Sequence, residues 1–399
     1  MTADAAVFEQ AMREALALAV KGRFRTAPNP CVGAVLLRGG DIVARGFHEY
    51  FGEPHAEVNA LADAAAKGVN PAECTLVVTL EPCAHYGKTP PCAEAVLRAG
   101  IRRVVIGAPD PNAEAAGGAD MLRRDGVSVI TGVLERECTD LIADFHTWRT
   151  TELPHTILKL ASTLDGRIAT RNGHSQWISG EQTRALVHEM RRDMGAILVG
   201  GNTFYQDNPR LDCRPASGAP PAAKQPLAVV VTSRLPAPDM AAYLIQNRPQ
   251  DLIFWTTVAA AASSKAEALR KKGVRILGLP PLLLAENTPP SSVRAELDLR
   301  AGLASLRQEH GCHYALCEGG GRLGLSLLEN RLAGEVRLHL SPRILADNEA
   351  TPLFDGMSPL QLDDGISLRI AGTSLCGEDL IISLRPSPST GDAAEGTEL

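Results

Sequence analysis

Hydrophobic and polar positions alternate along residues 1–150 with two different periodicities. Apolar side chains from Phe8 to Ala19 recur at helical spacing, which predicts a first helix with one buried stripe. A second helical pattern follows His55 and ends at Gly68. Short apolar runs predict strands, at 32–37, 41–45, 76–80, 104–106 and 127–130. This alternation predicts a three-layer α/β/α domain over residues 1–150.

The pattern breaks at 150–154 and then resumes, which predicts a second α/β domain over residues 151–385. No internal repeat relates the two halves. Strand-like runs open and close the second half, at 155–161, 335–340 and 380–384. Residues 386–399 are polar and low in hydrophobic side chains, which predicts a disordered tail.

Five further segments carry expectations that a structure can check. Continuous helices are expected at 135–149 and 259–272. The apolar run at 196–203 is expected to be a strand that enters a loop. Proline-rich stretches predict exposed loops, at 216–225 and 280–292.

Composition narrows the class of protein. With 399 residues and 45% hydrophobic content, the chain is long enough for two globular cores. The formal net charge is -6, so the chain lacks the excess of basic residues that is typical of nucleic-acid-binding proteins. A small-molecule substrate is therefore expected. No apolar run is long enough to span a bilayer, and the N-terminus has no basic signal-peptide region. Nine scattered cysteines indicate a reducing compartment, so a cytoplasmic protein is expected.

One constellation carries hydrolytic chemistry. His55, Cys83 and Cys92 are three ligands that suit Zn²⁺ and leave a fourth position for water. The metal lowers the pKa of that water, and Glu57, which is not a ligand, would move its proton. Zinc nucleobase deaminases carry H-x-E followed by P-C-x-x-C. Here Pro82 and Cys83 fit, but eight residues separate the two cysteines.

Each part of this constellation has an ordinary alternative. An H-A-E triplet is commonly the start of a helix, and a buried cysteine is commonly a small hydrophobic side chain. The combination is more specific, because His55 opens a helix, Cys83 closes a strand and Cys92 opens the next helix. The combination therefore favours a zinc deaminase.

The surrounding motifs resemble the bifunctional deaminase–reductase family of riboflavin biosynthesis. The chain has P-N-P-x-V-G at 28–33, G-x-H at 46–48, P-H-A-E at 54–57 and T-L-E-P-C-x-H-x-G-x-T-P-P-C at 79–92. The long spacing between the cysteines is thus a family signature. The resemblance implies a cytidine-deaminase-like first domain with one Zn²⁺ per chain and Glu57 as the catalytic residue. It implies substrate contacts from Asn29, His48, His85, Lys88, Thr89, Asp110 and Asn112.

The first domain also departs from the family. The family usually continues D-P-N-P-x-x-x-G-x-G, whereas residues 110–119 read D-P-N-A-E-A-A-G-G-A. This leaves the geometry of the loop open, including the place of the usual second glycine. Three of the implied contacts keep an ordinary alternative: Lys88 as a solvated loop lysine, His48 as a satisfied loop histidine, and His85 as a brace of the loop.

The second half resembles the reductase domain of the same family, which is related to dihydrofolate reductase. Its motifs are K-x-A-x-x-L-D-G-R-I-A, S-x-W-I, A-I-L-V-G-x-x-T, D-x-P-x-L-x-x-R and E-G-G, at 159–169, 175–178, 196–203, 207–214 and 318–320. The resemblance implies NADPH contacts from Ala161, Trp177, Thr203, Asp207, Ser233, Gly320, Gly321, Arg322, Leu323, Gly324, Leu325 and Ser326. It implies contacts to the ribosyl substrate from Ser175, Arg191, Leu211, Arg214 and Glu318.

Some of these residues can be argued from chemistry. A strand followed by Gly319, Gly320 and Gly321 and then a helix can bind a pyrophosphate through backbone amides. The pattern is not G-x-G-x-x-G, so a Rossmann fold is not supported. Arg191 and Arg214 suit a phosphate, because guanidinium is permanently charged and bidentate.

Alternatives stay open for these residues too. They are a flexible turn at the three glycines, an ordinary turn at Ser233, a solvated helix arginine at Arg191 and a core residue at Trp177. His310 and His313 flank Cys312, but no second ligand cluster lies nearby in the sequence, so a metal site is not expected there.

The sequence therefore predicts a bifunctional enzyme. Zinc hydroxide would deaminate 2,5-diamino-6-(5-phosphoribosylamino)pyrimidin-4-one, and NADPH would then reduce its ribosyl side chain to ribityl. No general acid for the reduction emerges from the sequence; Asp207 and a bound water are candidates. A homo-oligomer, either dimer or tetramer, is expected, with no nucleic-acid or membrane partner.

Three other functions fit parts of the sequence. One is a monofunctional zinc deaminase whose second domain binds nucleotides as a regulatory module. Another is a catalytically silent zinc protein, which the presence of Glu57 disfavours. The third is an RNA-editing deaminase, which the acidic balance disfavours.

Overall fold

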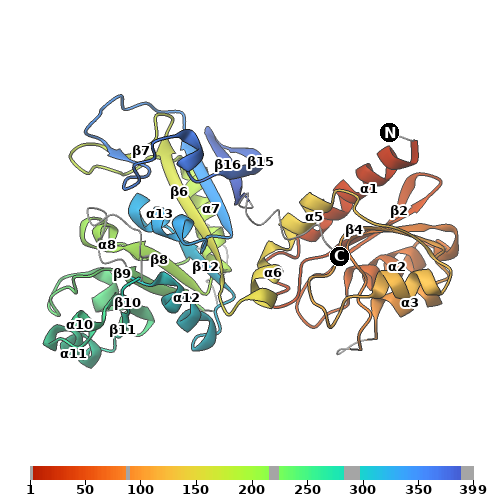
Figure 1. Ribbon diagram of the computed structural model, residues 1–399, viewed down its shortest axis with the longest axis horizontal. Coiled ribbons are helices and arrows are strands. Elements are labelled where there is room, and N and C mark those ends of the chain that lie inside the picture. Colours follow the sequence, from red (N-terminus) through yellow and green to blue (C-terminus); the bar gives the residue numbers. More distant parts are fainter. Residues whose placement is uncertain (1–2, 87–89, 215–223, 283–296, 388–399) are drawn as a thin grey trace. The chain divides into compact units, whose positions relative to one another are not determined.

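The computed structural model describes residues 3–86, 90–214, 224–282 and 297–387 (Figure 1). The chain divides into two compact units, Met1–Thr151 and Glu152–Leu399. No helix in the described ranges is long and apolar enough to cross a membrane.

The first unit is built on a five-stranded sheet of order β2-β1-β3-β4-β5. The pairs β1–β2 and β1–β3 are antiparallel, while β3–β4 and β4–β5 are parallel. The strands are β1 Gly33–Arg38, β2 Asp41–Phe47, β3 Thr75–Leu80, β4 Arg103–Ala108 and β5 Ser128–Ile130. The helices are α1 Ala3–Val20, α2 Ala56–Ala66, α3 Cys92–Arg98, α4 Gly118–Arg124, α5 Glu135–Leu141 and α6 Ala143–Thr150, with a 3₁₀ turn at Pro71–Glu73.

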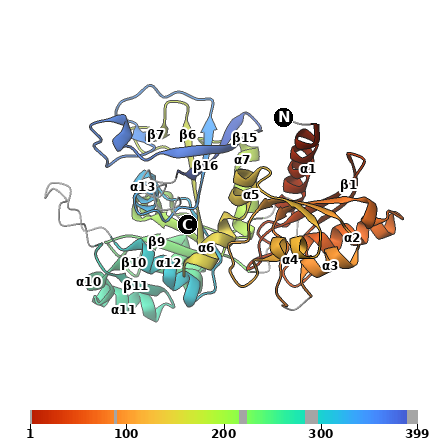
Figure 2. The ribbon, with the colours of Figure 1, turned by 45° about the vertical axis from the view of Figure 1, so that its right-hand side comes forward.

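Helices cover both faces of this sheet. In Figures 1 and 2, α1 and α5 lie on one side of the strands, and α2 and α3 lie on the other. Met12 of α1 and Cys138 of α5 pack with Val35, Val77 and Val105 in one core cluster. The adjacent strand residues, which face the opposite way, are buried on the side of the sheet where α2 and α3 lie (Figure 1). The first unit therefore has the three layers that the hydrophobic pattern predicts.

The second unit is built on a nine-stranded sheet of order β11-β10-β9-β8-β12-β6-β13-β16-β15. All pairs from β11 to β13 are parallel, and β16 and β15 add antiparallel strands at one edge. The sheet strands are β6 His155–Thr163, β8 Ala196–Gly200, β9 Leu227–Val231, β10 Leu252–Thr257, β11 Arg275–Leu279, β12 Tyr314–Cys317, β13 Glu335–Ser341, β15 Leu368–Cys376 and β16 Asp379–Pro386. A separate pair joins β7 Arg167–Ala169 to β14 Thr351–Pro352.

Helices connect the parallel strands of this second sheet. They are α7 Glu181–Arg192, α8 Gly201–Asp207, α9 Tyr243–Asn247, α10 Val258–Ala261, α11 Ser264–Lys271, α12 Leu299–Gln308 and α13 Gly321–Glu329, with 3₁₀ turns at Pro249–Asp251 and Leu362–Asp364. The side chains of successive strand residues point to opposite faces of the sheet and pack in two different hydrophobic cores. Leu198 and Val229 pack with α12 and α13, whereas Ile197 and Ala228 pack with α8, α9 and α11.

Several elements differ from the sequence-based expectations. The helix expected at 135–149 is broken at Ile142, which lies between α5 and α6 with a φ of -102°. The helix expected at 259–272 is also broken, because the Ser263 hydroxyl accepts the Ala266 N–H and caps a new helix. The strand expected at 196–203 ends at Gly200, and α8 begins at Gly201, so Thr203 lies on a helix.

Candidate active sites

The three candidate metal ligands of the first unit, one histidine and two cysteines, come from three different elements. His55 is the N-cap of α2, Cys83 follows β3, and Cys92 is the first residue of α3. The His55 Nδ1 atom lies 3.8 Å from Cys83 Sγ and 3.3 Å from Cys92 Sγ. Such separations fit a tetrahedral zinc ion, whose bonds to nitrogen and sulfur are about 2.0–2.3 Å. Within the described ranges, this is the group of residues that could hold a metal ion.

Hydrogen bonds among these three residues favour the metal-binding form of a cysteine side chain. The backbone N–H of Cys92 donates to Cys83 Sγ at 3.3 Å. Hydrogen bonds from Cys92 and His55 hold the pKa of the Cys83 thiol well below its usual value. A thiolate is the form that binds metal. The soft sulfur donors, one imidazole and a stabilised thiolate therefore fit Zn²⁺.

Glu57 lies in the first turn of α2, two residues after His55, and its side chain is buried at 4% exposure. Burial raises the pKa of its carboxyl group. The glutamate is outside the ligand group itself. Its carboxyl group interacts with His55 and Cys92, so it is a candidate for carrying a proton beside a bound metal.

His48 and Asn29 form a fixed pair beside the ligands. The His48 and His55 rings meet edge to face, with centroids 5.1 Å apart. His48 Nδ1 lies 3.1 Å from the Pro54 carbonyl oxygen and Nε2 lies 3.3 Å from Asn29 Nδ2. A carbonyl accepts and an amide nitrogen donates, so the ring is the neutral Nδ1–H tautomer. Burial favours this form by lowering the pKa of His48.

The altered loop at 110–119 is organised by Glu81. Its carboxylate accepts the backbone N–H groups of Asp110, Gly117 and Ala119 at 3.3, 3.0 and 2.9 Å. Gly117 has a φ of +99°, and a Cβ on Gly118 would lie 1.7 Å from the Pro82 carbonyl oxygen. Both glycines are thus required at 117 and 118, and the second family glycine is not needed at 119.

The remaining expected contacts of the first unit differ in their surroundings. Asp110 accepts the Asn112 N–H at 2.8 Å, and burial raises the pKa of Asp110. The Asn112 amide oxygen accepts from Arg149, so this side chain is already engaged. His85 is exposed. Lys88 and Thr89 lie outside the described residues.

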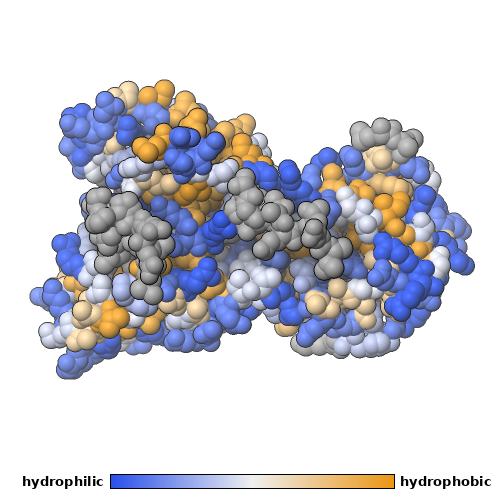
Figure 3. Space-filling view, viewed as in Figure 1, coloured by the Kyte–Doolittle hydropathy of each residue, from blue (hydrophilic) through white to orange (hydrophobic). Residues whose placement is uncertain are grey.

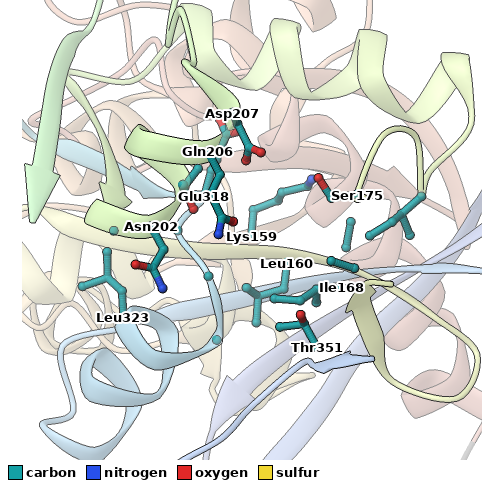
Figure 4. Close-up of a pocket in the computed structure, with 18 of the residues that line it drawn as sticks. Lys159, Leu160, Ile168, Ser175, Asn202, Gln206, Asp207, Glu318, Leu323 and Thr351 are labelled. Atoms are coloured by element: carbon teal, nitrogen blue, oxygen red, sulfur yellow. The ribbon is translucent and has the colours of Figure 1, made fainter. Parts of the chain in front are cut away.

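The second unit contains a large cavity of about 1410 Å³ (Figure 4). Ordinary small-molecule pockets measure about 300–1,000 Å³, so this cavity has room for a dinucleotide and a second ligand. Of the expected residues, fourteen line it: Ala161, Ser175, Trp177, Arg191, Thr203, Asp207, Arg214, Ser233, Glu318, Gly320, Gly321, Arg322, Leu323 and Ser326.

Three expected residues do not line this cavity. Gly324 packs against Leu158, whose Cδ1 would lie 3.1 Å from an added Cβ, and Leu325 is buried at 7% exposure. Both lie on the face of α13 that turns away from the cavity, because a helix exposes only one stripe to a neighbour. Leu211 is 3% exposed and packs in the core with α8 and α9.

Two of the three glycines at 319–321 are required by close packing, whereas a Cβ on Gly320 would meet no atom within 4 Å. A Cβ on Gly321 would lie 2.0 Å from the Leu353 carbonyl oxygen, and one on Gly319 would lie 2.9 Å from the Gly200 nitrogen. Gly320 is the N-cap of α13, a helix of nine residues. Free N–H groups at such a helix start can bind an anionic group. The glycines therefore form a cradle at the cavity wall instead of a flexible turn.

Arg191 and Glu318 form an ion pair in the wall of the cavity. The two contacts measure 2.6 and 2.7 Å, and each side chain is 12% exposed. Arg191 Nη1 also donates to the Asp212 carbonyl oxygen at 3.0 Å. Burial alone would raise the pKa of Glu318, but the Arg191 charge holds it below its usual value. Three of the five guanidinium donors are thus used inside the protein, which leaves Arg191 only partly available to a phosphate.

Lys159 is a site residue that the sequence reasoning missed. It lies on β6 and lines the cavity, and burial lowers the pKa of its ammonium group. Figure 4 shows its side chain extending into the cavity, with its nitrogen next to Ser175. The signal in the sequence was a single lysine within the apolar run 155–161.

Trp177 is not a core residue. It is 58% exposed at the cavity, and the Arg184 guanidinium lies 4.6 Å from its ring centroid. Its carbonyl oxygen accepts from Arg343 at 3.2 Å. The indole therefore offers an exposed flat surface next to the cavity.

Comparison with known proteins gives the same two-part division. A family model for the RibD C-terminal domain matches residues 154–382, and one for the cytidine and deoxycytidylate deaminase zinc-binding region matches residues 6–108. The riboflavin biosynthesis protein RibD of Actinobacillus pleuropneumoniae is 38% identical over 378 residues, which cover 93% of each chain.

Solved structures also match over nearly the whole chain. A diaminohydroxyphosphoribosylaminopyrimidine deaminase/5-amino-6-(5-phosphoribosylamino)uracil reductase from Thermotoga maritima is 32% identical with a TM-score of 0.71. RibD of Acinetobacter baumannii is 30% identical with a TM-score of 0.69. Both comparisons cover 96% of this chain and 100% of the other.

The fold and the two sites define an enzyme that joins a zinc-binding deaminase domain to a reductase domain with a nucleotide cofactor. The chain belongs to the RibD family, the bifunctional deaminase–reductases of riboflavin biosynthesis. The resemblance seen in the sequence motifs, the fold class and the pair of enzyme activities are thereby confirmed.

Proposed function

We propose that the first unit deaminates 2,5-diamino-6-(5-phosphoribosylamino)pyrimidin-4-one and that the second unit reduces the product with NADPH. The first step exchanges an exocyclic amino group for oxygen, with water consumed and ammonia released. The second adds a hydride to the ribosyl carbon and a proton to the ring oxygen, which opens the sugar to ribityl. The observation that carries the proposal is the presence of both sites in one chain: the zinc ligands beside Glu57, and a cavity large enough for two ligands.

In the deaminase unit, a bound zinc ion would supply an acidified water molecule. Glu57 would hold the proton of this water and deliver it to the departing amine, and its burial keeps the proton from exchanging with solvent. Asn29 and His48 would orient the ring, because their mutual hydrogen bond fixes which of their atoms remain for the substrate.

In the reductase unit, the cofactor would supply the hydride, and the chain would hold both reactants in place. The glycine cradle at α13 would bind the pyrophosphate of NADPH. Arg214 lines the cavity and would contact the substrate phosphate, with the remaining donors of Arg191 beside it. Lys159, Asp207 and Glu318 are titratable groups that could relay the proton.

The preference for NADPH over NADH has a direct test. Ser233 follows β9 and lines the cavity, where the 2′-phosphate of NADPH would bind. A carboxylate at this position would repel that phosphate, so Ser233→Asp is expected to raise the Kd of NADPH about tenfold or more. The Kd of NADH should stay within about twofold, because NADH has no 2′-phosphate. Fluorescence titration measures both, and equal effects on the two cofactors would contradict the assignment.

We further propose self-association through the edge strand β15. Its backbone edge pairs with no other strand among the described residues, and Ile370 and Leu375 are 62% and 76% exposed. Figure 3 shows hydrophobic surface gathered over β15 and β16. A second copy that pairs antiparallel with this strand would cover both side chains.

This association predicts that Ile370→Lys combined with Leu375→Lys lowers the molar mass measured by light scattering to that of a monomer of 42.3 kDa. Leu362→Lys is the matched control, because Leu362 is 99% exposed but lies outside β15. An unchanged mass in the double variant would exclude this surface as the interface.

Stoichiometry and location complete the proposal. We propose one zinc ion per chain, which is supported by the one candidate ligand group among the described residues. A cytoplasmic location fits the nine free cysteines.

The function as a whole is tested by following ammonia release and NADPH oxidation in one sample that contains the aminopyrimidine phosphate. Ammonia release without NADPH oxidation would instead favour the monofunctional deaminase.

A further inference from the structure

Segment 208–214 of the second unit has a strained backbone. Asn208 and Leu211 both lie in the left-handed region, with φ of +44° and +47°. Asn208 follows the last residue of α8, where asparagine adopts this conformation readily, but a leucine such as Leu211 keeps it only where its surroundings enforce it. The segment matters to the cavity, because Arg214 lines it and the Asp212 carbonyl oxygen accepts from Arg191.

Arg248 holds the backbone of this segment through several hydrogen bonds. Its Nη1 donates to the carbonyl oxygens of Arg210 and Leu211 at 3.0 and 2.7 Å. Its Nη2 donates to the Pro226 carbonyl oxygen at 2.6 Å, directly before β9. Asp251 accepts from Nε and Nη2, both at 3.3 Å, and orients the guanidinium. One planar side chain therefore joins the strained turn to the strand that leads to Ser233.

The arginine itself does not line the cavity. Its side chain is 9% exposed and is not among the residues that line the cavity. From Leu211 the contacts continue through the Asp212 carbonyl oxygen to Arg191, and from Arg191 to Glu318. A substitution of Arg248 would therefore alter the positions of cavity-lining side chains through the backbone of segment 208–214.

We propose that Arg248 is a positioning residue of the reductase, which holds segment 208–214 so that Arg214 and Arg191 meet the substrate phosphate together. The inference rests on the proposed use of the cavity by a ribosyl phosphate. The proposal also gives Leu211 a role, although its side chain is buried away from the cavity: its backbone carbonyl oxygen accepts a hydrogen bond from Arg248. Lysine cannot replace this arginine, because one ammonium group cannot span three carbonyl oxygens in fixed directions.

The test is Arg248→Lys in the full chain, with NADPH and the deaminated aminopyrimidine phosphate as substrates. The KM for the pyrimidine should rise about 10- to 100-fold, because misplaced binding groups weaken substrate contacts. The Kd of NADPH should rise by a smaller factor than this KM, since Ser233 lies at the opposite end of β9 from the Pro226 carbonyl group that Arg248 contacts. Asp251→Asn, at a side chain that is 42% exposed, should raise the same KM by a smaller factor without threatening the fold.

Arg385→Lys is the matched control. Arg385 is 11% exposed and likewise donates to a backbone carbonyl, that of Gly334, and to a carboxylate, that of Glu335, but it does not contact segment 208–214. Its replacement should leave the pyrimidine KM unchanged. An unchanged KM in both Arg248→Lys and Asp251→Asn would overturn the inference, as would an equal rise in KM in Arg385→Lys. If the unaltered protein does not oxidise NADPH with this substrate, the proposed function fails first.

Discussion

Glu57→Gln is expected to reduce ammonia release by about three orders of magnitude, which is within the range of general acid–base catalysis. The amide keeps the size of the side chain but cannot accept the proton of the attacking water. Because Glu57 is outside the ligand group, the variant should keep its zinc. NADPH oxidation on substrate that is already deaminated should continue at the normal rate, because the second unit has its own cavity.

The experiment compares three quantities in each variant: ammonia release, zinc content and NADPH oxidation. Glu53→Gln is the matched control, because Glu53 is an exposed carboxylate four residues earlier in the chain. Normal ammonia release in Glu57→Gln would exclude the proton-carrying role. Loss of zinc together with activity would show instead that Glu57 is a ligand.

Arg191→Ala is expected to reduce kcat/KM of the reductase about 100-fold or more, because it leaves the Glu318 charge buried and unpaired. Both side chains are only 12% exposed, so the unfolding free energy of the second unit should fall by about 3–5 kcal/mol at pH 7. Arg192→Ala, at the exposed neighbour on α7, should change neither quantity. Unfolding in urea and steady-state kinetics provide the two measurements.

The same variant has a predicted pH dependence. In the native protein the pKa of Glu318 lies below its usual value, so the Arg191–Glu318 ion pair stabilises the fold fully above the unfolded pKa of about 4.3. This stabilisation is lost as the pH falls through the lower pKa of the folded protein. Without Arg191, burial raises this pKa, and the ionised carboxylate opposes folding. The stability difference between the two proteins should therefore shrink as pH falls from 7 towards about 4. A constant difference would contradict the pairing.

The zinc site could be predicted from sequence because its parts are local. His55 and Cys92 stand at the starts of helices and Cys83 closely follows a strand, so each candidate ligand is placed by an element that its neighbours in sequence define. The alternating layers could be predicted for the same reason. By contrast, β15 gave no hydrophobic signal, because most of its side chains are exposed.

The reductase cavity depends on contacts between distant residues, and the sequence reasoning was correspondingly weaker there. Arg191 was expected to contact a phosphate, but Glu318, which pairs with it, is 127 positions away. Lys159 was missed because its place in the cavity depends on α7 and α13, which follow later in the chain. Leu211 was assigned by resemblance, and neither its left-handed backbone nor the hydrogen bond from Arg248 to its carbonyl group could be predicted from the sequence.

The central claim is that one chain performs both reactions on one substrate. Its most direct test incubates the zinc-loaded protein with 2,5-diamino-6-(5-phosphoribosylamino)pyrimidin-4-one, first without and then with NADPH, and follows ammonia, NADPH and product mass. Ammonia release should be complete before NADPH is added, and one equivalent of NADPH should then be oxidised to give the ribityl product. Ammonia release with no later NADPH oxidation, or a ribosyl product that persists, would contradict the account.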